Sequence, residues 1–184
     1  LFQVAVPEAF NMGGATDTRG VIESLTGTIL RDLKISGLFN IIPREAYLGD
    51  STAEGMTPNY RDWFNIGTQG LIKAGYKISG NKVVVDLRLY SIDNSQQVKL
   101  EGPYTGPVEM PIDEKKLRRY THGFVNEVIR FFTKAPGFFN SRLVVVKRTA
   151  KGKDLFMVSP DGLEETRLTR SGGINMLPSL GQGQ

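Results

Sequence analysis

The first part of the chain shows strand periodicity followed by helical periodicity. The apolar run from Phe2 to Val6 predicts a short strand. Asp17 or Thr18 can cap a following helix, and Gly37 ends it. The apolar residues of this helix recur three and four positions apart, at Ile22, Leu25, Ile29 and Leu33. A second strand is predicted from Leu38 to Ile42.

The middle of the chain carries the clearest strand pattern. Side chains alternate between apolar and polar from Ile72 to Ile78 and again from Val83 to Leu89, on either side of a Gly80-Asn81 turn. A third strand is predicted from Val98 to Tyr104. Together these segments predict an antiparallel meander with one buried face. A short helix before the meander is expected to dock the aromatic pair Trp63-Phe64 into the core.

A second long helix is predicted after Asp113. Its apolar stripe consists of Leu117, Tyr120, Phe124, Val128 and Phe131, widened by Val125, Ile129 and Phe132. Two such helices can cover one face of a sheet. The predicted fold class is therefore α+β, a two-layer domain of two long helices on a mixed sheet with an antiparallel meander. Pro136-Gly137 predicts a hinge, so the first domain is placed at residues 1–135.

The remaining segment, residues 136–184, has the pattern of three short strands. Ser159-Pro160-Asp161-Gly162 is a turn signal, because Pro sets one dihedral angle, Asp bonds back to the backbone and Gly takes positive φ. One set of alternating positions holds Leu143, Val145, Leu155 and Met157, and the other holds Val144, Val146, Phe156 and Val158. Both faces are then apolar, as in a sheet between neighbours. We expect an incomplete β-propeller blade, covered by further blades or by another chain.

Charge and composition narrow the function classes. Residues 112–184 hold 13 basic and 7 acidic side chains, a net +6. A basic half can attract nucleic acid, so a nucleic-acid-binding α/β domain stays open as an alternative. The charges fall in turns and on helix faces with few aromatic residues among them, which favours a solvated surface. The chain has no cysteine and no apolar run near the roughly 20 residues that span a bilayer, so thiolate metal sites and direct membrane insertion are not expected.

Motifs for catalysis are scarce. His122 is the only histidine, and we expect a helix-surface or partly packed residue rather than a catalytic base. The best candidate for an anion-binding site is the loop Asn11-Met12-Gly13-Gly14, because it precedes a helix N-terminus. A nucleotide-dependent enzyme that uses this loop is therefore a third interpretation. A plain connection is favoured because the lysine of phosphate-binding loops is missing. Asp154 and Asp161 are interpreted as hairpin-turn residues rather than calcium ligands. No catalytic, cofactor-binding or metal-binding residue is assigned.

Several segments, in this order and spacing, resemble the TolB family. The resemblance covers nearly the whole chain, from the end of the first helix to the last strands. The segments are Asp32 to Phe39, Trp63 to Gly67, Gly75-Tyr76, Val83 to Tyr90, Arg118 to Thr133, Gly137 to Phe139, Asp154 to Gly162, Leu168-Thr169 and Asn175 to Ser179. Lys134-Ala135 and the ending Leu180-Gly181-Gln182 depart from the family pattern.

The resemblance implies a non-enzymatic protein of the Tol–Pal system, in the periplasm of a Gram-negative bacterium. TolB-family proteins join an N-terminal α/β domain to a six-bladed β-propeller. They bind the lipoprotein Pal and the inner-membrane protein TolA, and they support outer-membrane integrity, protein transport and cell division. No cofactor is implied. The residues that contact partners are left unassigned, because the family's Pal contacts lie mainly on the propeller.

Overall fold

The computed structural model describes residues 1–179, and the family departure at Leu180-Gly181-Gln182 lies outside them. The chain forms two compact units, the first from Leu1 to Gly137 and the second from Phe138 onward. Within the described residues, no helix is both long and apolar enough to span a bilayer.

A mixed sheet is the centre of the first unit, as the sequence predicts. Its main order is β3-β1-β4-β5-β6, with β2 beside β4 and β7 beside β5. Strand β1 runs parallel to both of its neighbours, β3 and β4, whereas β4 and β5 form an antiparallel hairpin. The strands are β1 (Phe2–Ala5), β2 (Phe10–Asn11), β3 (Phe39–Ile41), β4 (Gly70–Ser79), β5 (Lys82–Ser91), β6 (Gln96–Gln97) and β7 (Val108–Pro111).

The hairpin is confirmed, but the third meander strand is wrong. No strand runs from Val98 to Tyr104; two shorter strands, β6 and β7, pair with opposite ends of β5 instead. Gly102-Pro103 interrupts the predicted segment, because Pro lacks the backbone N–H that a ladder needs. Tyr104 is buried all the same, and its hydroxyl donates to the carbonyl of Tyr120 at 3.0 Å. The apolar pattern of this segment therefore reflects a packed loop.

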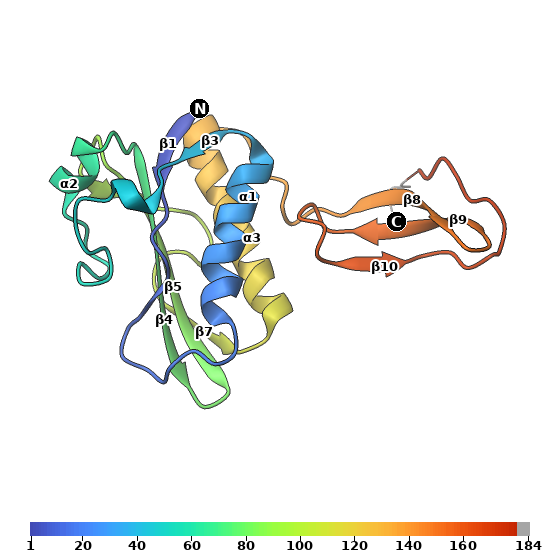
Figure 1. Cartoon of the computed structure of the whole chain (residues 1–184), viewed down its shortest axis with the longest axis horizontal. Helices are drawn as coiled ribbons and strands as arrows, with labels where there is room; N and C mark the ends of the chain where they lie inside the picture. The colour runs from blue at the N-terminus through green and yellow to red at the C-terminus, as the bar shows by residue number, and fades with distance from the viewer. Residues whose placement is uncertain (180–184) are drawn as a thin grey trace. The chain divides into compact units, whose positions relative to one another are not determined.

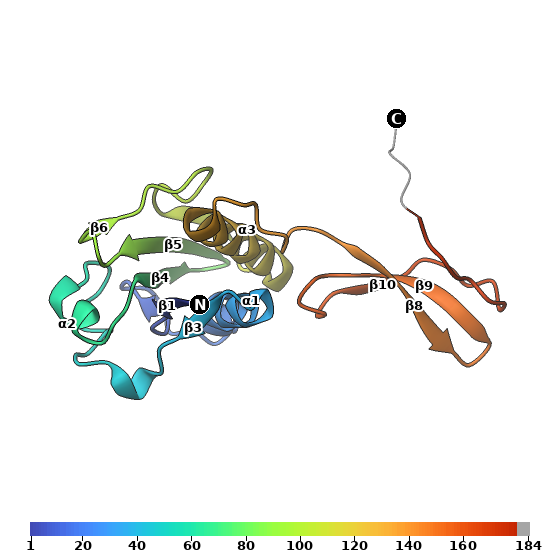
Figure 2. The same cartoon turned by 90° about the horizontal axis from the view of Figure 1, so that it is seen from above.

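Two long helical segments lie side by side on one face of the sheet (Figures 1 and 2). The first is α1 (Thr28–Ser36), preceded by a five-residue π-helical segment (Glu23–Gly27), and the second is α3 (Glu114–Thr133). Their fully buried side chains include Leu25, Ile29, Leu33, Leu117 and Phe124. Gly37 ends α1 with φ of 66°, as predicted. The π-helical segment has no counterpart in the sequence prediction.

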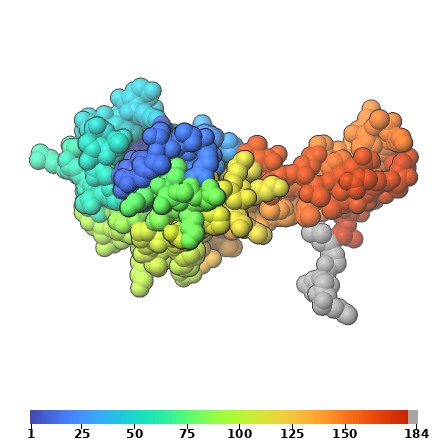
Figure 3. Space-filling model, turned by 90° about the horizontal axis from the view of Figure 1, so that it is seen from below, coloured from blue at the N-terminus to red at the C-terminus, as the bar shows by residue number. Residues whose placement is uncertain are grey.

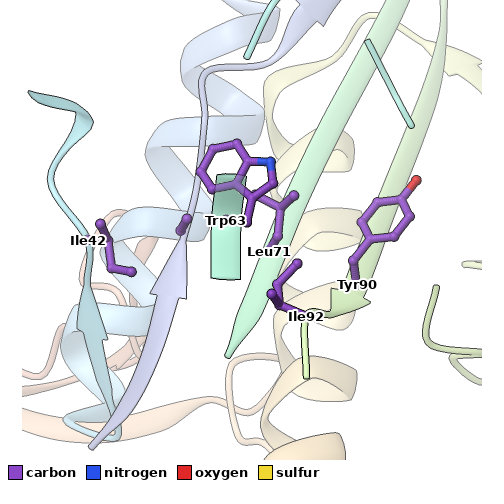
Figure 4. Close-up of a cluster of buried hydrophobic side chains, with 6 residues drawn as sticks. Ile42, Trp63, Leu71, Tyr90 and Ile92 are labelled. Atoms are coloured by element: carbon purple, nitrogen blue, oxygen red, sulfur yellow. The ribbon is translucent and has the colours of Figure 1, made fainter. Parts of the chain in front are cut away.

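The opposite face of the sheet is partly covered too, so the two-layer description is incomplete. The short helix α2 (Tyr60–Asn65) packs Trp63 into a second apolar cluster, shown in Figure 4. Figure 2 shows α2 on the side of the sheet away from α1 and α3. Phe64 did not dock as expected, because it is 62% exposed. The cluster consists of Ala5, Ile42, Trp63, Leu71, Tyr90 and Ile92.

The second unit contains an antiparallel sheet of order β10-β9-β8, as the sequence predicts. Its strands are β8 (Leu143–Thr149), β9 (Gly152–Val158) and β10 (Glu165–Arg167). The register pairs Val145 with Phe156 and Val146 with Leu155, so Phe156 shares a face with Val145 and not with Val146. The predicted corner is confirmed, since Gly162 has φ of 74° and Asp161 accepts the N–H of Leu163.

Candidate functional site

In the glycine-containing loop before the first helix, the Asn11 side chain hydrogen-bonds to the backbone groups of the loop itself. Asn11 Oδ1 accepts the N–H groups of Gly13 and Gly14 at 3.0 and 2.7 Å, and its Nδ2 donates to the carbonyls of Gly14 and Ala15. A Cβ on Gly14 would lie 2.5 Å from the backbone nitrogen of Ile78. Glycine is therefore required there by the close approach of the loop to β4, and its N–H groups are not presented to a phosphate.

The helix N-terminus that follows is filled by Asp17. Its carboxylate accepts the N–H groups of Arg19 and Ile22, both at 2.9 Å. Burial raises the pKa of this carboxyl, but the backbone N–H donors outweigh burial and the net pKa is lowered. An ionised carboxylate repels a phosphate from the position that the nucleotide interpretation requires. The geometry therefore favours the plain strand-to-helix connection.

His122 is more buried than the sequence suggests. It is 4% exposed on α3, and its Nδ1 lies 2.6 Å from Oδ2 of Asp32 on α1. The expectation of a helix-surface or partly packed residue is therefore wrong. The helical stripe did not show this pair because its members are 90 residues apart in sequence. Within the first unit the pair links α1 to α3, which is a structural role.

The loop between β3 and α2 is anchored to the sheet by a buried ion pair. Lys73, on β4, has a side chain that is 2% exposed and pairs with Glu54, whose side chain is 15% exposed. Lys73 Nζ also donates to the carbonyls of Ser51 and Gly55, at 3.3 and 2.6 Å. Burial lowers the pKa of Lys73, and the Glu54 carboxylate offsets part of this effect. The loop is thus held by charge as well as by apolar packing.

Two aromatic side chains complete this anchor. Trp63 Nε1 donates to Glu54 Oε1 at 3.0 Å, and the Tyr90 hydroxyl donates to the carbonyl of Met56. Tyr47 packs edge-on against Trp63, with ring centroids 4.8 Å apart. The segment from residue 44 to 59, cyan to teal in Figure 3, lies on the surface of the first unit. The sequence pattern predicted a docked Trp63 but gave no sign of the Lys73–Glu54 pair, because one buried face of the sheet was expected and the pair lies on the other.

Asp154 organises the second unit. It lies within β9, not in a turn as the sequence suggested, and it is 1% exposed. Its carboxylate accepts from Thr149 Oγ1 at 3.2 Å, Thr169 Oγ1 at 2.9 Å and Arg167 at 2.5 Å. Burial raises the pKa of Asp154, but the hydrogen bonds from Thr169 and Arg167 outweigh it, so the pKa is lowered. This residue is a structural centre of the sheet.

We expect Asp154→Asn to loosen the second unit. The amide would lose the charge-assisted bond to Arg167 and place an N–H₂ group among donors. A lowered carboxyl pKa stabilises the fold above the unfolded value near 3.8, and this contribution is lost as pH falls through the folded value. In the full-length protein, the protection factors of the β8 to β10 amides should therefore fall in acid for the parent, whereas in the variant they should already be low at pH 7. Glu164→Gln, at a partly exposed ion pair with Arg142, is the control and should match the parent. Equal exchange in Asp154→Asn and parent would contradict this role.

Three of the seven basic side chains of the second unit, those of Arg142, Lys147 and Arg167, form ion pairs within the unit. Arg142 contacts Glu164 at 3.1 Å, and Lys147 contacts Glu165 at 2.6 Å. Lys147 also lies 5.2 Å from the centroid of the Phe156 ring. Such pairing leaves fewer cations for phosphates, so it gives no support to the nucleic-acid interpretation.

Eight of the twelve exposed large apolar side chains among the described residues belong to the second unit. Leu143 and Val146 lie on opposite faces of the sheet, so apolar side chains are exposed on both of its faces. The exposed members are Phe138, Leu143, Val146, Leu163, Leu168, Ile174, Met176 and Leu177. Among the described residues, no strand covers the outer edge of β8.

The comparisons with known proteins agree with this architecture of a mixed α/β unit followed by an antiparallel sheet. Residues 1–98 match the family model of the TolB amino-terminal domain. Because that match spans more than half of the chain, the chain belongs to the TolB family, which confirms the resemblance seen in the sequence.

Curated relatives extend the similarity into the second unit. The chain is 28% identical over 168 residues to the Tol-Pal system protein TolB of Syntrophotalea carbinolica, covering 90% of this chain and 37% of that protein. It is 28% identical over 180 residues to that of Geobacter sulfurreducens, covering 96% and 39%. It thus spans about two fifths of the length of these relatives. A crystal structure of TolB from Acinetobacter baumannii shares the fold, with a TM-score of 0.69 over 93% of this chain and 39% of that chain, at 16% identity.

Proposed function

We propose that this chain is the N-terminal part of a non-catalytic, protein-binding scaffold of the Tol–Pal system, in the periplasm of a Gram-negative bacterium. The observation that carries the proposal is the match of residues 1–98 to the TolB amino-terminal domain, together with relatives named as Tol-Pal system proteins. In the full-length protein the scaffold binds Pal and TolA, and so supports outer-membrane integrity, protein transport and cell division.

Each of the two units is assigned its own role. We propose that residues 1–135 form the α/β domain and that residues 136–184 begin a β-propeller. The relatives are more than twice as long as this chain, which leaves room for the further blades. The mechanism is presentation of surface: a rigid α/β domain, a loop held by Lys73, and a propeller that offers a second face to partners. No step of it requires a cofactor or a metal.

The direct test is co-purification. The full-length protein, immobilised and exposed to a detergent extract of a Gram-negative envelope, should retain Pal and TolA. Nuclease treatment and elevated salt separate this outcome from the nucleic-acid alternative, because phosphate-driven binding fades steeply with salt. Retention of nucleic acid without Pal or TolA would refute the proposed function.

We expect the second unit to be stable only when another part of the protein packs on its exposed apolar side chains and on the free edge of β8. In the 184-residue chain alone, its apolar side chains and the edge of β8 are open, so amides in residues 142–170 should exchange rapidly and the chain should self-associate. In the full-length protein the same amides should be protected. Hydrogen exchange with light scattering measures both. A monomeric 184-residue chain with strongly protected amides in this range would show that the unit is self-sufficient, and the propeller proposal would fail.

A further inference from the structure

A small pocket lies beneath the anchored loop of the first unit. Its volume is about 270 Å³, and its wall is formed partly by Trp63 and Leu48. Sites for small-molecule ligands and cofactors span roughly 300–1,000 Å³, so this pocket suits one long side chain better than a nucleotide. Leu48 is 61% exposed, which places an apolar contact at the mouth. The other lining residues are Gly49, Asp50, Ser51, Ala53, Glu54, Asn59 and Asp62.

The charge of the pocket is unbalanced. Three carboxylates line it, and Lys73 neutralises the one on Glu54. Asp50 uses Oδ1 to accept the N–H groups of Thr52 and Ala53, and Asp62 uses Oδ2 to accept from Asn59. Among the described residues, neither Asp50 nor Asp62 forms an ion pair with a lysine or arginine. The pocket therefore presents two negative charges beside apolar surface.

Two negative charges beside apolar surface favour a ligand that carries both a positive charge and an apolar stem. The oxygens of the three carboxylates do not gather within 4.8 Å of one another, so they are too dispersed to ligate one metal ion together. A long basic side chain can lay its apolar stem along Leu48 and Trp63 and keep its cationic head between carboxylates. An aromatic wall adds attraction for a cation.

We propose that this pocket is a docking site for an arginine or lysine side chain of a partner protein. The first unit would then contribute its own contact to assembly, independent of any contact made by a propeller. The proposal does not rest on the identity of the partner, because it follows from the lining of the pocket alone.

Trp63 provides a direct readout, because it is the only tryptophan of the 184-residue chain and it lines the pocket. The probe is the peptide acetyl-Leu-Arg-Leu-amide, and its partner probe carries citrulline, the neutral isostere of arginine. The arginine peptide should shift Trp63 emission saturably, and the citrulline peptide should bind at least several-fold more weakly. Calorimetry with the full-length protein gives a second readout that is independent of other tryptophans.

Matched variants locate the site. Asp50→Asn and Asp62→Asn remove the charges but keep an oxygen acceptor for the local hydrogen bonds. Each should raise the dissociation constant of the arginine peptide about threefold, as for exposed ion pairs. Asp93→Asn, at an exposed turn outside the pocket, should leave it unchanged. Thermal melts verify that each variant is folded.

Three results would overturn the proposal. These are equal binding of both peptides, unchanged binding in the Asp50 and Asp62 variants, and no saturable response to the arginine peptide. A response of Trp63 to calcium or magnesium chloride alone, abolished by the same variants, would reassign the pocket to a metal ion and also refute the proposal.

Discussion

Phe124→Asp is expected to unfold the first unit. Phe124 lies on α3 with no exposed surface and packs against Tyr104, with ring centroids 5.7 Å apart. An aspartate there would bury a carboxylate without a cation, which costs several kcal/mol. That cost is on the order of the whole stability of a domain, roughly 5–15 kcal/mol. Far-ultraviolet circular dichroism should show loss of helix at room temperature.

The control uses the same substitution at an exposed phenylalanine. Phe64 is 62% exposed on α2, and Phe64→Asp should change the free energy of unfolding by no more than about 0.5 kcal/mol. Leu87→Asp repeats the test from the sheet, since Leu87 on β5 is 1% exposed and shares a cross-strand pair with Ala74. If Phe124→Asp and Leu87→Asp melt like Phe64→Asp, the assignment of the helix-covered face is wrong.

Lys73→Met is the second substitution with a large expected effect. Methionine replaces the lysine stem up to Cε but leaves the Glu54 carboxylate and the carbonyls of Ser51 and Gly55 without their donor. Removing one partner of a buried ion pair typically costs about 3–5 kcal/mol. We expect the lower end, because Glu54 is 15% exposed and can turn toward water. Amides of residues 50–59 should then exchange faster than the rest of the unit.

Two comparisons make this prediction specific. Lys82→Met breaks an ion pair with Glu109 in which both side chains are more than half exposed, and it should cost less than about 1 kcal/mol. The double variant Lys73→Met with Glu54→Gln should recover part of the loss, because no charge is left buried. Equal free energies of unfolding for Lys73→Met and Lys82→Met would show that the loop is not held by the buried pair.

The sequence predicted those elements whose signal is local. The hairpin of β4 and β5 follows from alternation around a Gly80-Asn81 turn, and the end of α1 follows from Gly37. The predicted strand from Val98 to Tyr104 failed because burial in a packed loop gives the same apolar pattern as burial in a strand. The corner at Asp161-Gly162 succeeded because its turn chemistry is contained within four residues.

The buried polar pairs of the first unit could not be predicted, because the two residues of each pair are distant in sequence or come from different elements. His122 and Asp32 meet across two helices, and Lys73 meets Glu54 only because a loop folds over the second face of the sheet. A lysine within a strand pattern, at a position opposite Arg88, was the one available signal of a polar contact on that face. Asp154 was interpreted as a hairpin-turn residue, whereas the turn ends before β9 begins at Gly152.

Calorimetry of the full-length protein with purified Pal and purified TolA tests the central claim most directly. We expect saturable binding of each partner in the absence of nucleotide, nucleic acid or added metal. We also expect that Phe64→Asp, whose fold should be intact, still binds Pal. A correctly folded full-length protein that binds neither Pal nor TolA would contradict the assignment of this chain to a Tol–Pal scaffold.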